Sequence, residues 1–471
     1  MTGEPATTIS LEEALDALTA NHPIFAKTSL EIKQAQLNES ALKQEEVWHL
    51  RLREENLLQG GDPANPFGPT RALGASAKVG LQRDFWSNGS RLEVGLTSSY
   101  LYLQHDDDAG TFALGAPNLP DVAIPLTRDG LESALSVQYT YPLMQNPGLL
   151  KKLSLQDAAL RVEEQEYQAR EVQEHAMVSV AALFVQWWLL SEQEKILLKR
   201  VNLAKENRRL VSKRQRARLA ERVDVLRSEQ ALERARSGLA ECRWRASGIV
   251  AELQTILGLD NLAKKVPQAI SPEEPAAMQD DATWVMETRR LSILNNLKTR
   301  LQLKVSAEEE RLKPELALVM RAGVKREDFR YTDDASEGEF NPDAFAGVTF
   351  SVPLDRSFVQ TGIESVMVGQ RIVDEEIRAQ RLELISKKAR IDSERDSLTA
   401  LVAVKDRQLS VASQRAREEA KLFKLGRTLL NFVIQSQDDV QQAKMERLEV
   451  VGRLAQLEIE RLALMDLLVA R

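Results

Sequence analysis

The sequence predicts a mainly α-helical fold with a smaller β portion, built as two structural repeats. One short alternating strand occurs twice in the 471 residues, as VQYTYPL at 137–143 and as VTFSVPL at 348–354. Proline is absent between Gly148 and Lys265 and again from Leu354 to Arg471, and both stretches are rich in strong helix formers. Two such helical blocks after two matching strands indicate an internal repeat.

Each helical block is predicted to be a long hairpin with a coiled-coil packing stripe. Apolar residues recur at spacings of three and four, as in the segment 201–211. The blocks are interrupted once each, at 217–226 (ARLAERVDVL) and at 424–433 (KLGRTLLNFV). Counted from the strand ends, the first helix of each hairpin has 76 or 72 residues (219 − 143 and 426 − 354), hence a length of roughly 110 Å.

The strands alternate between apolar and polar residues. The same alternation marks two upstream partner strands, at 93–102 and 315–325. One face is predicted to carry Leu135, Val137, Tyr139, Leu318, Met320, Val348 and Phe350, and the other Gln138, Thr140, Arg321, Thr349 and Ser351. Such alternation suits a half-buried soluble sheet and a membrane barrel equally well.

Geometry favours a membrane β-barrel portion that several chains share. Four strands cannot close alone, because membrane barrels start at eight, and helices of roughly 110 Å extend far beyond a sheet about 33 Å tall. Two chains would give eight strands, and side chains fill a barrel of that size. Three chains would give twelve strands, which leave an open lumen. Tyr100, Tyr102, Tyr139 and Tyr141 lie near strand ends, where an aromatic girdle is expected.

The segment 73–85 also alternates and precedes an Asn88-Gly89 hairpin turn. A chain that leaves and re-enters one side of a membrane needs an even number of strands, so 73–85 is predicted to be an extra β arm outside the barrel, and 105–130 an external loop. The predicted first repeat is 1–266, with a helix, the β-hairpin 91–144 and the helical hairpin 148–258. The second is 267–471, with helix 281–312, β-hairpin 314–354 and helical hairpin 356–470.

Composition excludes several other classes. The net charge of −7, with interleaved signs, argues against nucleic-acid binding. A single cysteine, Cys242, rules out a disulfide framework and a Cys-based zinc site. No stretch is long and apolar enough for a membrane helix, and the opening lacks signal-peptide features, which predicts either a cytosolic protein or a mature chain.

Enzyme chemistry has no supporting motif. There is no phosphate loop, no GxSxG and no HExxH, so no enzyme, cofactor or metal is predicted. The cluster His105–Asp108 offers carboxylates to a cation, but a solvated loop is the simpler interpretation because no glycine-centred ligand spacing follows. Trp187-Trp188 is predicted to pack between helices, and Cys242 to be a small buried side chain.

These segments together resemble the TolC family of outer-membrane efflux and secretion ducts. The resemblance is carried by ISLEEAL (9–15) with Asn21-His22-Pro23, by the two strand-to-helix joints, and by the helix turns 218–230 and 424–439. It implies a homotrimer with a twelve-strand barrel in the outer membrane and a twelve-helix tunnel in the periplasm. It also implies partners at the tunnel tip, namely a periplasmic adaptor protein and an inner-membrane transporter, in drug efflux or type I protein secretion.

The resemblance further implies roles for residues at the two helix turns. The expected periplasmic gate residues are Asp224, Arg427 and Asn431, and the adaptor-contacting tip residues are Arg218, Leu219, Ala220, Lys424, Leu425 and Gly426. Asn431 and Ile434 stand where the family carries acidic residues, which argues against an acidic constriction. The alternative is a structural coiled-coil protein with a soluble β cap, which would not need detergent for extraction.

Overall fold

The computed structural model describes residues 8–60, 71–104, 111–112, 122–123, 127–218, 220–269, 283–331, 334–336, 338–352, 357–425 and 427–469. The chain forms two compact units. The helical unit comprises Met1–Gln34, Glu163–Asn296 and Asp374–Arg471, and the sheet unit comprises Ala35–Val162 and Leu297–Val373. Each unit therefore takes residues from both sequence repeats.

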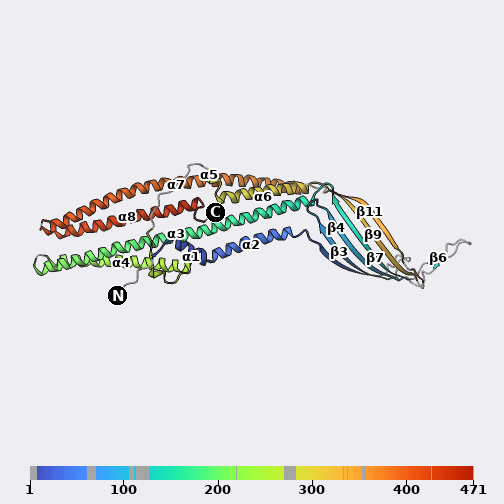
Figure 1. Ribbon diagram of the computed structural model, residues 1–471, viewed down its shortest axis with the longest axis horizontal. Helices are drawn as coiled ribbons and strands as arrows, with labels where there is room; N and C mark the ends of the chain where they lie inside the picture. The colour runs from blue at the N-terminus through green and yellow to red at the C-terminus, as the bar shows by residue number, and fades with distance from the viewer. Residues whose placement is uncertain are drawn as a thin grey trace. The chain divides into compact units, whose positions relative to one another are not determined.

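Two long helical hairpins dominate the helical unit (Figure 1). The first joins α3 (Pro147–Arg216) to α4 (Arg222–Leu257), and the second joins α7 (Ser357–Lys424) to α8 (Leu430–Leu464). With 70 and 68 residues, α3 and α7 confirm the prediction of two long helices of nearly equal length. The cation–π contact of Arg214 with Phe423, at 5.3 Å, places the far ends of α3 and α7 next to each other.

Shorter elements complete the helical unit. Helix α1 (Leu11–Asn21) begins with a capping box, in which the Ser10 hydroxyl accepts from the Glu13 nitrogen and the Glu13 carboxylate accepts from the Ser10 nitrogen, both at 3.1 Å. The remaining helices are α2 (Pro23–Lys43), the short α5 (Thr283–Met286), α6 (Arg289–Arg311) and the 3-10 turn η2 (Leu262–Lys264). Strands β1 (Thr8–Ile9) and β8 (Val266–Pro267) pair in parallel.

The core of the helical unit lies on two sides of α3. Phe184 and Trp187 pack with Leu18 of α1 and Leu253 of α4, and the two rings meet edge to face at 5.7 Å. Val185 and Trp188, next along the chain, pack with Ala455 and Ile459 of α8 instead. Both tryptophans are 5% exposed, which confirms the predicted packing role. Nearer the turn, Val201 packs with Leu232 and Leu239 of α4, as the coiled-coil stripe predicts.

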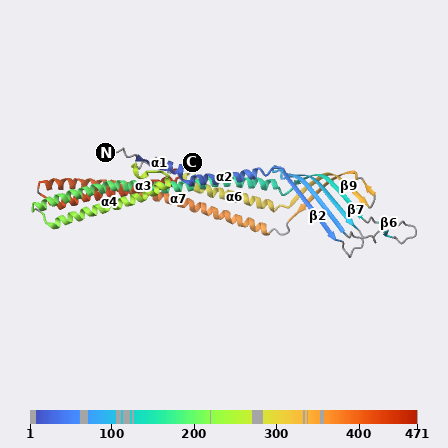
Figure 2. The same ribbon diagram turned by 90° about the horizontal axis from the view of Figure 1, so that it is seen from below.

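One antiparallel sheet dominates the sheet unit (Figures 1 and 2). Its long strands are β2 (His49–Gly60), β3 (Arg71–Asp84), β4 (Arg91–Gln104), β7 (Thr127–Pro142), β9 (Glu315–Tyr331) and β11 (Phe340–Ser351). They lie side by side in this order, and the short β10 (Asp334–Ser336) also pairs with β9. Strands β5 (Thr111–Phe112) and β6 (Val122–Ala123) pair separately.

The fold class is as predicted, but the sheet has more strands than the four expected. The segment 73–85, predicted as an extra β arm outside the barrel, belongs to β3, which pairs with β4 over its full length within the sheet, from Arg71↔Gln104 to Asp84↔Arg91. Strand β2, which was not predicted, pairs with the other edge of β3. With β2 and β3 together, the described long strands between α2 and α3 number four, which is even. The predicted Asn88-Gly89 turn joins β3 to β4, with Gly89 at a φ of 72°.

Candidate functional site

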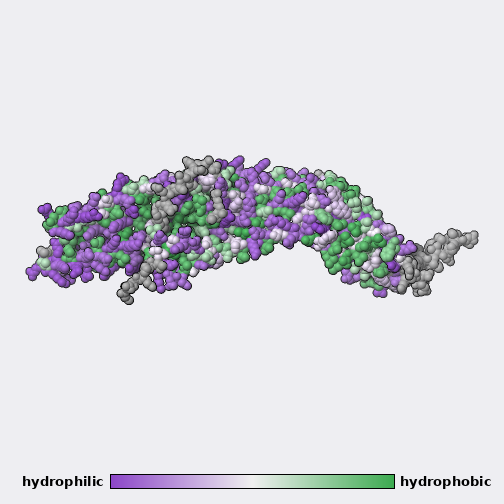
Figure 3. Space-filling model, in the orientation of Figure 1, coloured by the Kyte–Doolittle hydropathy of each residue, from purple (hydrophilic) through white to green (hydrophobic). Residues whose placement is uncertain are grey.

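One face of the sheet carries an apolar surface over the half of the strands nearer the helices. In an antiparallel ladder, paired residues lie on the same face, so the pairing of Leu50, Leu81, Val94, Val137 and Ala322 in turn makes one apolar row. The neighbouring row runs through Leu52, Val79, Leu96, Leu135 and Val324. Leu52 is 72% exposed and Val348 61%, and Figure 3 shows hydrophobic side chains gathered over the strands. An exposed apolar area of this kind marks a membrane or protein contact.

The opposite face of the sheet is charged. Lys78 pairs with Glu93 at 3.2 Å, and Lys325 with Glu132 at 3.3 Å. The register puts all seven residues predicted for the apolar face on one side and the five predicted polar residues on the other. Phe345 is an apolar exception on the polar face, opposite Arg321. The sheet thus has the amphipathic build that separates an apolar from an aqueous medium.

Both outer strands of the sheet have an open edge. Among the described strands, β2 pairs only with β3, and β11 pairs only with β9. Each of these two edge strands has 12 residues. Long open edges are templates for pairing with another chain. Each of these two edges can therefore accept a further strand.

The turn between α3 and α4 holds the first set of predicted site residues. Arg218 is exposed and takes a left-handed conformation, with a φ of 56°. Ala220 is half-buried, and Leu219 lies outside the described residues. Asp224 sits in the first turn of α4, where its Oδ2 accepts a hydrogen bond from the Glu221 nitrogen at 3.1 Å. Asp224 is thus a helix-capping residue, a role that sequence reasoning did not assign to it.

The turn between α7 and α8 holds the second set. Lys424, Leu425, Arg427 and Asn431 are exposed, and Leu425 keeps 67% of its surface accessible. Gly426 lies outside the described residues. The Arg427 nitrogen donates to the Leu422 carbonyl at 2.9 Å, which closes the end of α7. The described polar partners of Asp224 within the chain are Glu221 and Arg227, and not Arg427.

The two helical hairpins also contact each other behind these turns. Arg200 of α3 pairs with Asp438 of α8 at 3.0 Å, and Asn207 donates to Gln437 at 3.5 Å. Ile434, which stands where the resemblance would place an acid, lines a small pocket with these residues. The predicted site residues therefore lie at one end of a packed four-helix arrangement.

A buried ion cluster lies elsewhere in the helical unit and was not predicted. Arg289, at the start of α6, binds Glu174 and Glu171 of α3 and also Asp466, which follows α8. Arg289, Glu174 and Asp466 are 4%, 5% and 6% exposed. Asp466 also accepts from the Arg289 backbone nitrogen at 2.7 Å and so caps α6 from another part of the chain. The cluster locks three helices together.

The cluster has more carboxylates than guanidinium groups, and the pKa values of two of its carboxylates are raised. Three carboxylates face Arg289 and the half-exposed Arg290, which pairs with Glu171 at 3.1 Å. Burial, together with the charges of Asp466 and Glu171, raises the pKa of Glu174 to about 7 although Arg289 acts in the opposite direction. Burial also raises the pKa of Asp466. The three carboxylates lie close enough to share a metal ion, but the guanidinium of Arg289 already provides their counter-charge.

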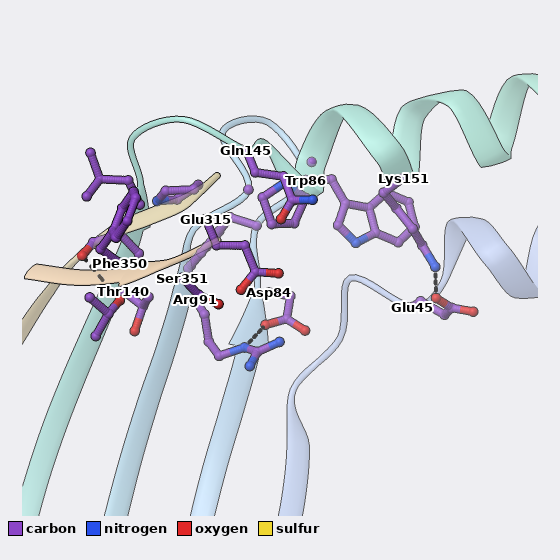
Figure 4. A pocket seen from close by; sticks show the side chains of 18 of the residues that line it. Glu45, Asp84, Trp86, Arg91, Thr140, Gln145, Lys151, Glu315, Phe350 and Ser351 are labelled. Atoms are coloured by element: carbon purple, nitrogen blue, oxygen red, sulfur yellow. Dashed lines mark hydrogen bonds and ion pairs between the residues drawn. The ribbon is translucent and has the colours of Figure 1, made fainter. Parts of the chain in front are cut away.

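A pocket lies where strands and helices join in the sheet unit (Figure 4). The Lys151 ammonium stacks on the Trp86 ring at 5.3 Å and forms an ion pair with Glu45. Burial lowers the pKa of Lys151. Arg91 pairs with Asp84 at 2.6 Å. Because each of these cations already faces a carboxylate, the pocket acts as a structural joint between α2, β3, β4 and α3.

Gly89 and Gly148 allow the close backbone contact at this joint. A Cβ on Gly148 would lie 2.4 Å from the Trp86 carbonyl oxygen and 2.7 Å from the Gly89 nitrogen. The β3–β4 turn therefore packs backbone to backbone against the start of α3. Asn146 caps that helix by accepting from the Gly148 nitrogen at 2.9 Å, and its own nitrogen donates to Glu310 of α6 at 2.8 Å.

Three further sequence predictions concern the 105–130 segment, Cys242 and membrane-spanning helices. The His105–Asp108 cluster and most of the predicted 105–130 loop lie outside them. Cys242 is buried, as predicted, and its thiol contacts the Leu190 carbonyl oxygen at 3.4 Å. Within the described part of the chain, none of the helices combines the length and the apolar character that a membrane crossing requires.

Comparisons with known proteins give matches at the level of structure. No protein-family model and no curated protein matches the sequence. The outer-membrane channel OprN is similar, with a TM-score of 0.67 and 12% identity over 97% of this chain and 89% of that one. VceC of Vibrio cholerae has a TM-score of 0.65 at 10% identity, covering 97% and 96%. CmeC of Campylobacter jejuni has a TM-score of 0.65 at 9% identity, covering 99% and 90%. The chain thus has the TolC-like fold of outer-membrane channels.

Proposed function

We propose that this chain, which has the fold of outer-membrane channels, is one subunit of a homotrimeric exit duct in the outer membrane of a Gram-negative cell. In this proposal the sheet lies in the membrane and the helical hairpins extend into the periplasm. The observation that carries the proposal is the sheet itself, with an exposed apolar face, a charged face and two open edges. A soluble cap would leave that apolar face in water, which is unfavourable.

The two faces of the sheet have complementary tasks in this duct. The apolar face contacts lipid, and the charged face lines an aqueous lumen, as in membrane barrels. One copy cannot close a barrel alone, because the six long strands among its described residues fall short of the eight that the smallest such barrels use. Assembly into a ring of copies supplies the missing strands, and cyclic symmetry makes every contact between copies identical.

The helix turns are the proposed contact site for partners. Each hairpin reverses at a turn with exposed side chains, among them Leu425 and Leu429, which are 67% and 66% exposed. Apolar side chains at a helix tip are suited to a periplasmic adaptor protein that links the duct to an inner-membrane transporter. The duct would then release small molecules or proteins, through an efflux pump or a type I secretion system, without catalysing a reaction itself.

The proposed gate also lies at these turns. A duct that is not attached to a pump must stay closed, and weak contacts between neighbouring hairpins achieve this while still being exchangeable. Asp224 and Arg427, from the two turns, offer a charge-assisted contact of this kind between neighbouring hairpins, and Asn431, in the first turn of α8, adds a polar side chain to the same gate.

The proposed function is tested by how the protein is extracted from cells and by the mass of its assembly. The full-length protein, expressed in a Gram-negative host, should sediment with outer membranes, require detergent for release and have the mass of three chains by native mass spectrometry. Reconstituted protein should conduct ions in planar bilayers. A chain that remains in the soluble fraction as a monomer would identify the structural coiled-coil alternative instead.

A further inference from the structure

We propose that three copies of the chain close an eighteen-strand barrel, in which β2 of one copy pairs with β11 of the next. The inference rests on the proposed trimeric duct and goes beyond it, since the resemblance drawn from the sequence implies twelve strands. The difference comes from the β2–β3 hairpin, which adds two strands to the sheet of each copy. It also moves one edge of the sheet from β4 to β2.

Strand direction allows this closure. The six long strands are antiparallel at every step, so β2 and β11 run in opposite directions. When β11 of one copy meets β2 of the next, the new pair is antiparallel like all the others. Among the described strands, four long ones lie between α2 and α3 and two long ones lie between α6 and α7, so each of these helices joins the sheet at the same end.

The register inside one copy predicts the register between copies. Starting from His49, the paired residues across the sheet are Gln82, Glu93, Gln138, Arg321 and finally Phe345. Phe345 lies six residues before Ser351, where β11 ends. If His49 of the next copy pairs with Ser351, the strand ends that join the helices lie at the same height around the ring. We call this pairing the end-level register.

This register gives a tilt typical of membrane barrels. Six strands span about 29 Å at a spacing of about 4.8 Å, and six residues along a strand span about 20 Å. The ratio corresponds to a strand tilt of about 35°, and transmembrane barrels tilt by about 35–45°. A ring of three copies in this register therefore has a strand tilt at the lower end of the usual range.

Side chains match in the same register. On the apolar face, Leu50 meets Phe350 and Leu52 meets Val348, so the apolar rows continue across the contact. On the other face, Arg51 meets Thr349, and no like charges stand opposite each other. Successive side chains of a strand point to opposite faces of the sheet. A slip by one residue would therefore place the apolar side chains of one strand opposite the polar side chains of the other, which is unfavourable.

The strand β2 carries one polar interruption, and the closure accommodates it. Glu54 lies on the apolar face and accepts a hydrogen bond from Asn56 at 3.4 Å. In the end-level register these residues meet Ala346 and Ala344 of the next copy. The small alanine side chains leave room for the two polar groups to stay paired with each other.

The strand number sets the width of the membrane part. Eighteen strands at a tilt of about 35° give a backbone diameter of roughly 34 Å, compared with roughly 22 Å for twelve. Porins with 16–18 strands contain a water-filled channel. The barrel of this duct would therefore be too wide to limit the size of its cargo, and selection would take place at the helix turns.

Disulfide trapping tests the strand contact. In a Cys242→Ala background, Arg51→Cys is combined with Thr349→Cys in the full-length trimer and oxidised in membranes. We expect covalent dimers and trimers on denaturing gels, and only monomers for either single variant. Because paired positions alternate between hydrogen-bonded and non-hydrogen-bonded sites, Leu50→Cys with Phe350→Cys provides a second, independent pair.

A matched pair tests the twelve-strand alternative. If β4 were the edge, the end-level register would pair Glu93 with Thr349, so Glu93→Cys with Thr349→Cys should then form the cross-link. Cross-linking of this pair, or of none of the pairs in a detergent-extracted trimer, would overturn the eighteen-strand barrel but leave the duct intact. A soluble monomer would overturn the proposed function as well.

Discussion

Asp224 accepts a hydrogen bond from the backbone nitrogen of Glu221 at 3.1 Å, and the Asp224 nitrogen donates in return to the Glu221 carbonyl oxygen at 3.2 Å. This reciprocal pair closes the first turn of α4, as a Ser/Thr capping box does in other helices. Asp224 therefore stabilises its own helix whether or not it also closes the duct. A test of the gate must separate these two roles.

Asp224→Asn together with Arg427→Gln provides that separation. Asparagine keeps the oxygen that caps α4 and loses the charge, so the helix start should remain intact. If the pair holds neighbouring hairpins together, the double variant should conduct more than the parent protein in planar bilayers, with an unchanged trimer mass. Exposed ion pairs contribute about 0–1 kcal/mol each, so the increase should be a few-fold. Arg222→Gln, an exposed charge in the same turn, serves as the control, and equal conductance of all three proteins would remove Asp224 and Arg427 from the gate.

Val348→Arg tests the orientation of the sheet. Val348 is 61% exposed on the apolar face, and an arginine on the lipid side of a barrel costs up to about 2–4 kcal/mol, with the largest cost at the bilayer midplane. Less trimer should assemble in membranes, and it should unfold at lower urea concentration. Ser99 lies on the other face, opposite Glu132 and away from the sheet edges, so Ser99→Arg should assemble normally. The orientation is wrong if the two variants behave alike.

Glu174→Gln should change how stability depends on pH. The folded pKa of Glu174 is about 7, above the ordinary value of 4.5, because burial favours the neutral acid. A raised acid pKa means that the stabilising contribution is complete below about pH 4.5 and is lost as the pH rises through 7. Urea midpoints between pH 5 and 8 should therefore fall more steeply for the parent than for the variant. The difference should reach about 2–3 kcal/mol at pH 8.

The control for this prediction is an acid on the same helix that lies away from the cluster. Glu192→Gln should leave the pH slope as it is in the parent protein. Burial also raises the pKa of Asp466. Part of the fall of stability with pH should therefore remain in the Glu174→Gln variant. Parallel curves for the parent and Glu174→Gln would show that Glu174 stays ionised throughout this range.

Gly148→Ala should destabilise the strand–helix joint. The new Cβ would meet backbone atoms of Trp86 and Gly89, which cannot move aside as a side chain can. Overpacking of this kind costs about 1–3 kcal/mol. Gly362→Ala is the matched control, because nothing lies within 4 Å of its Cβ and alanine favours the helix by about 1 kcal/mol. Thermal unfolding in detergent should shift in opposite directions for the two variants.

The helices and most strands were predictable because their signals are local. Helix-forming composition and a period of three to four residues identify α3 and α7 without knowledge of any contact. Alternation identifies β4, β7, β9 and β11 in the same way. Strand β2 begins with a clear alternation at His49–Arg53, but Glu54, Glu55 and Asn56 interrupt it. Its place in the sheet depends on pairing with β3, which a local pattern does not contain.

The ion cluster and the caps were not predictable for a related reason. Arg289 meets Glu174 and Asp466 across 115 and 177 residues of sequence, and no spacing rule connects them. Asp224 at the start of α4 follows a glutamate at the cap position, whereas the usual sequence signal begins with Ser or Thr. The residues at the helix turns were located correctly as turns, but their contacts between copies stay a prediction.

The two open edges of the sheet have a genetic consequence. A chain with a damaged β2 still offers an intact β11, so it can join a ring at one side and prevent that ring from closing. If half of the chains in a cell carry such damage and mix at random, only about one trimer in eight contains three sound copies. Alleles that disrupt one edge should therefore be dominant over the normal allele, whereas alleles that prevent synthesis should be recessive.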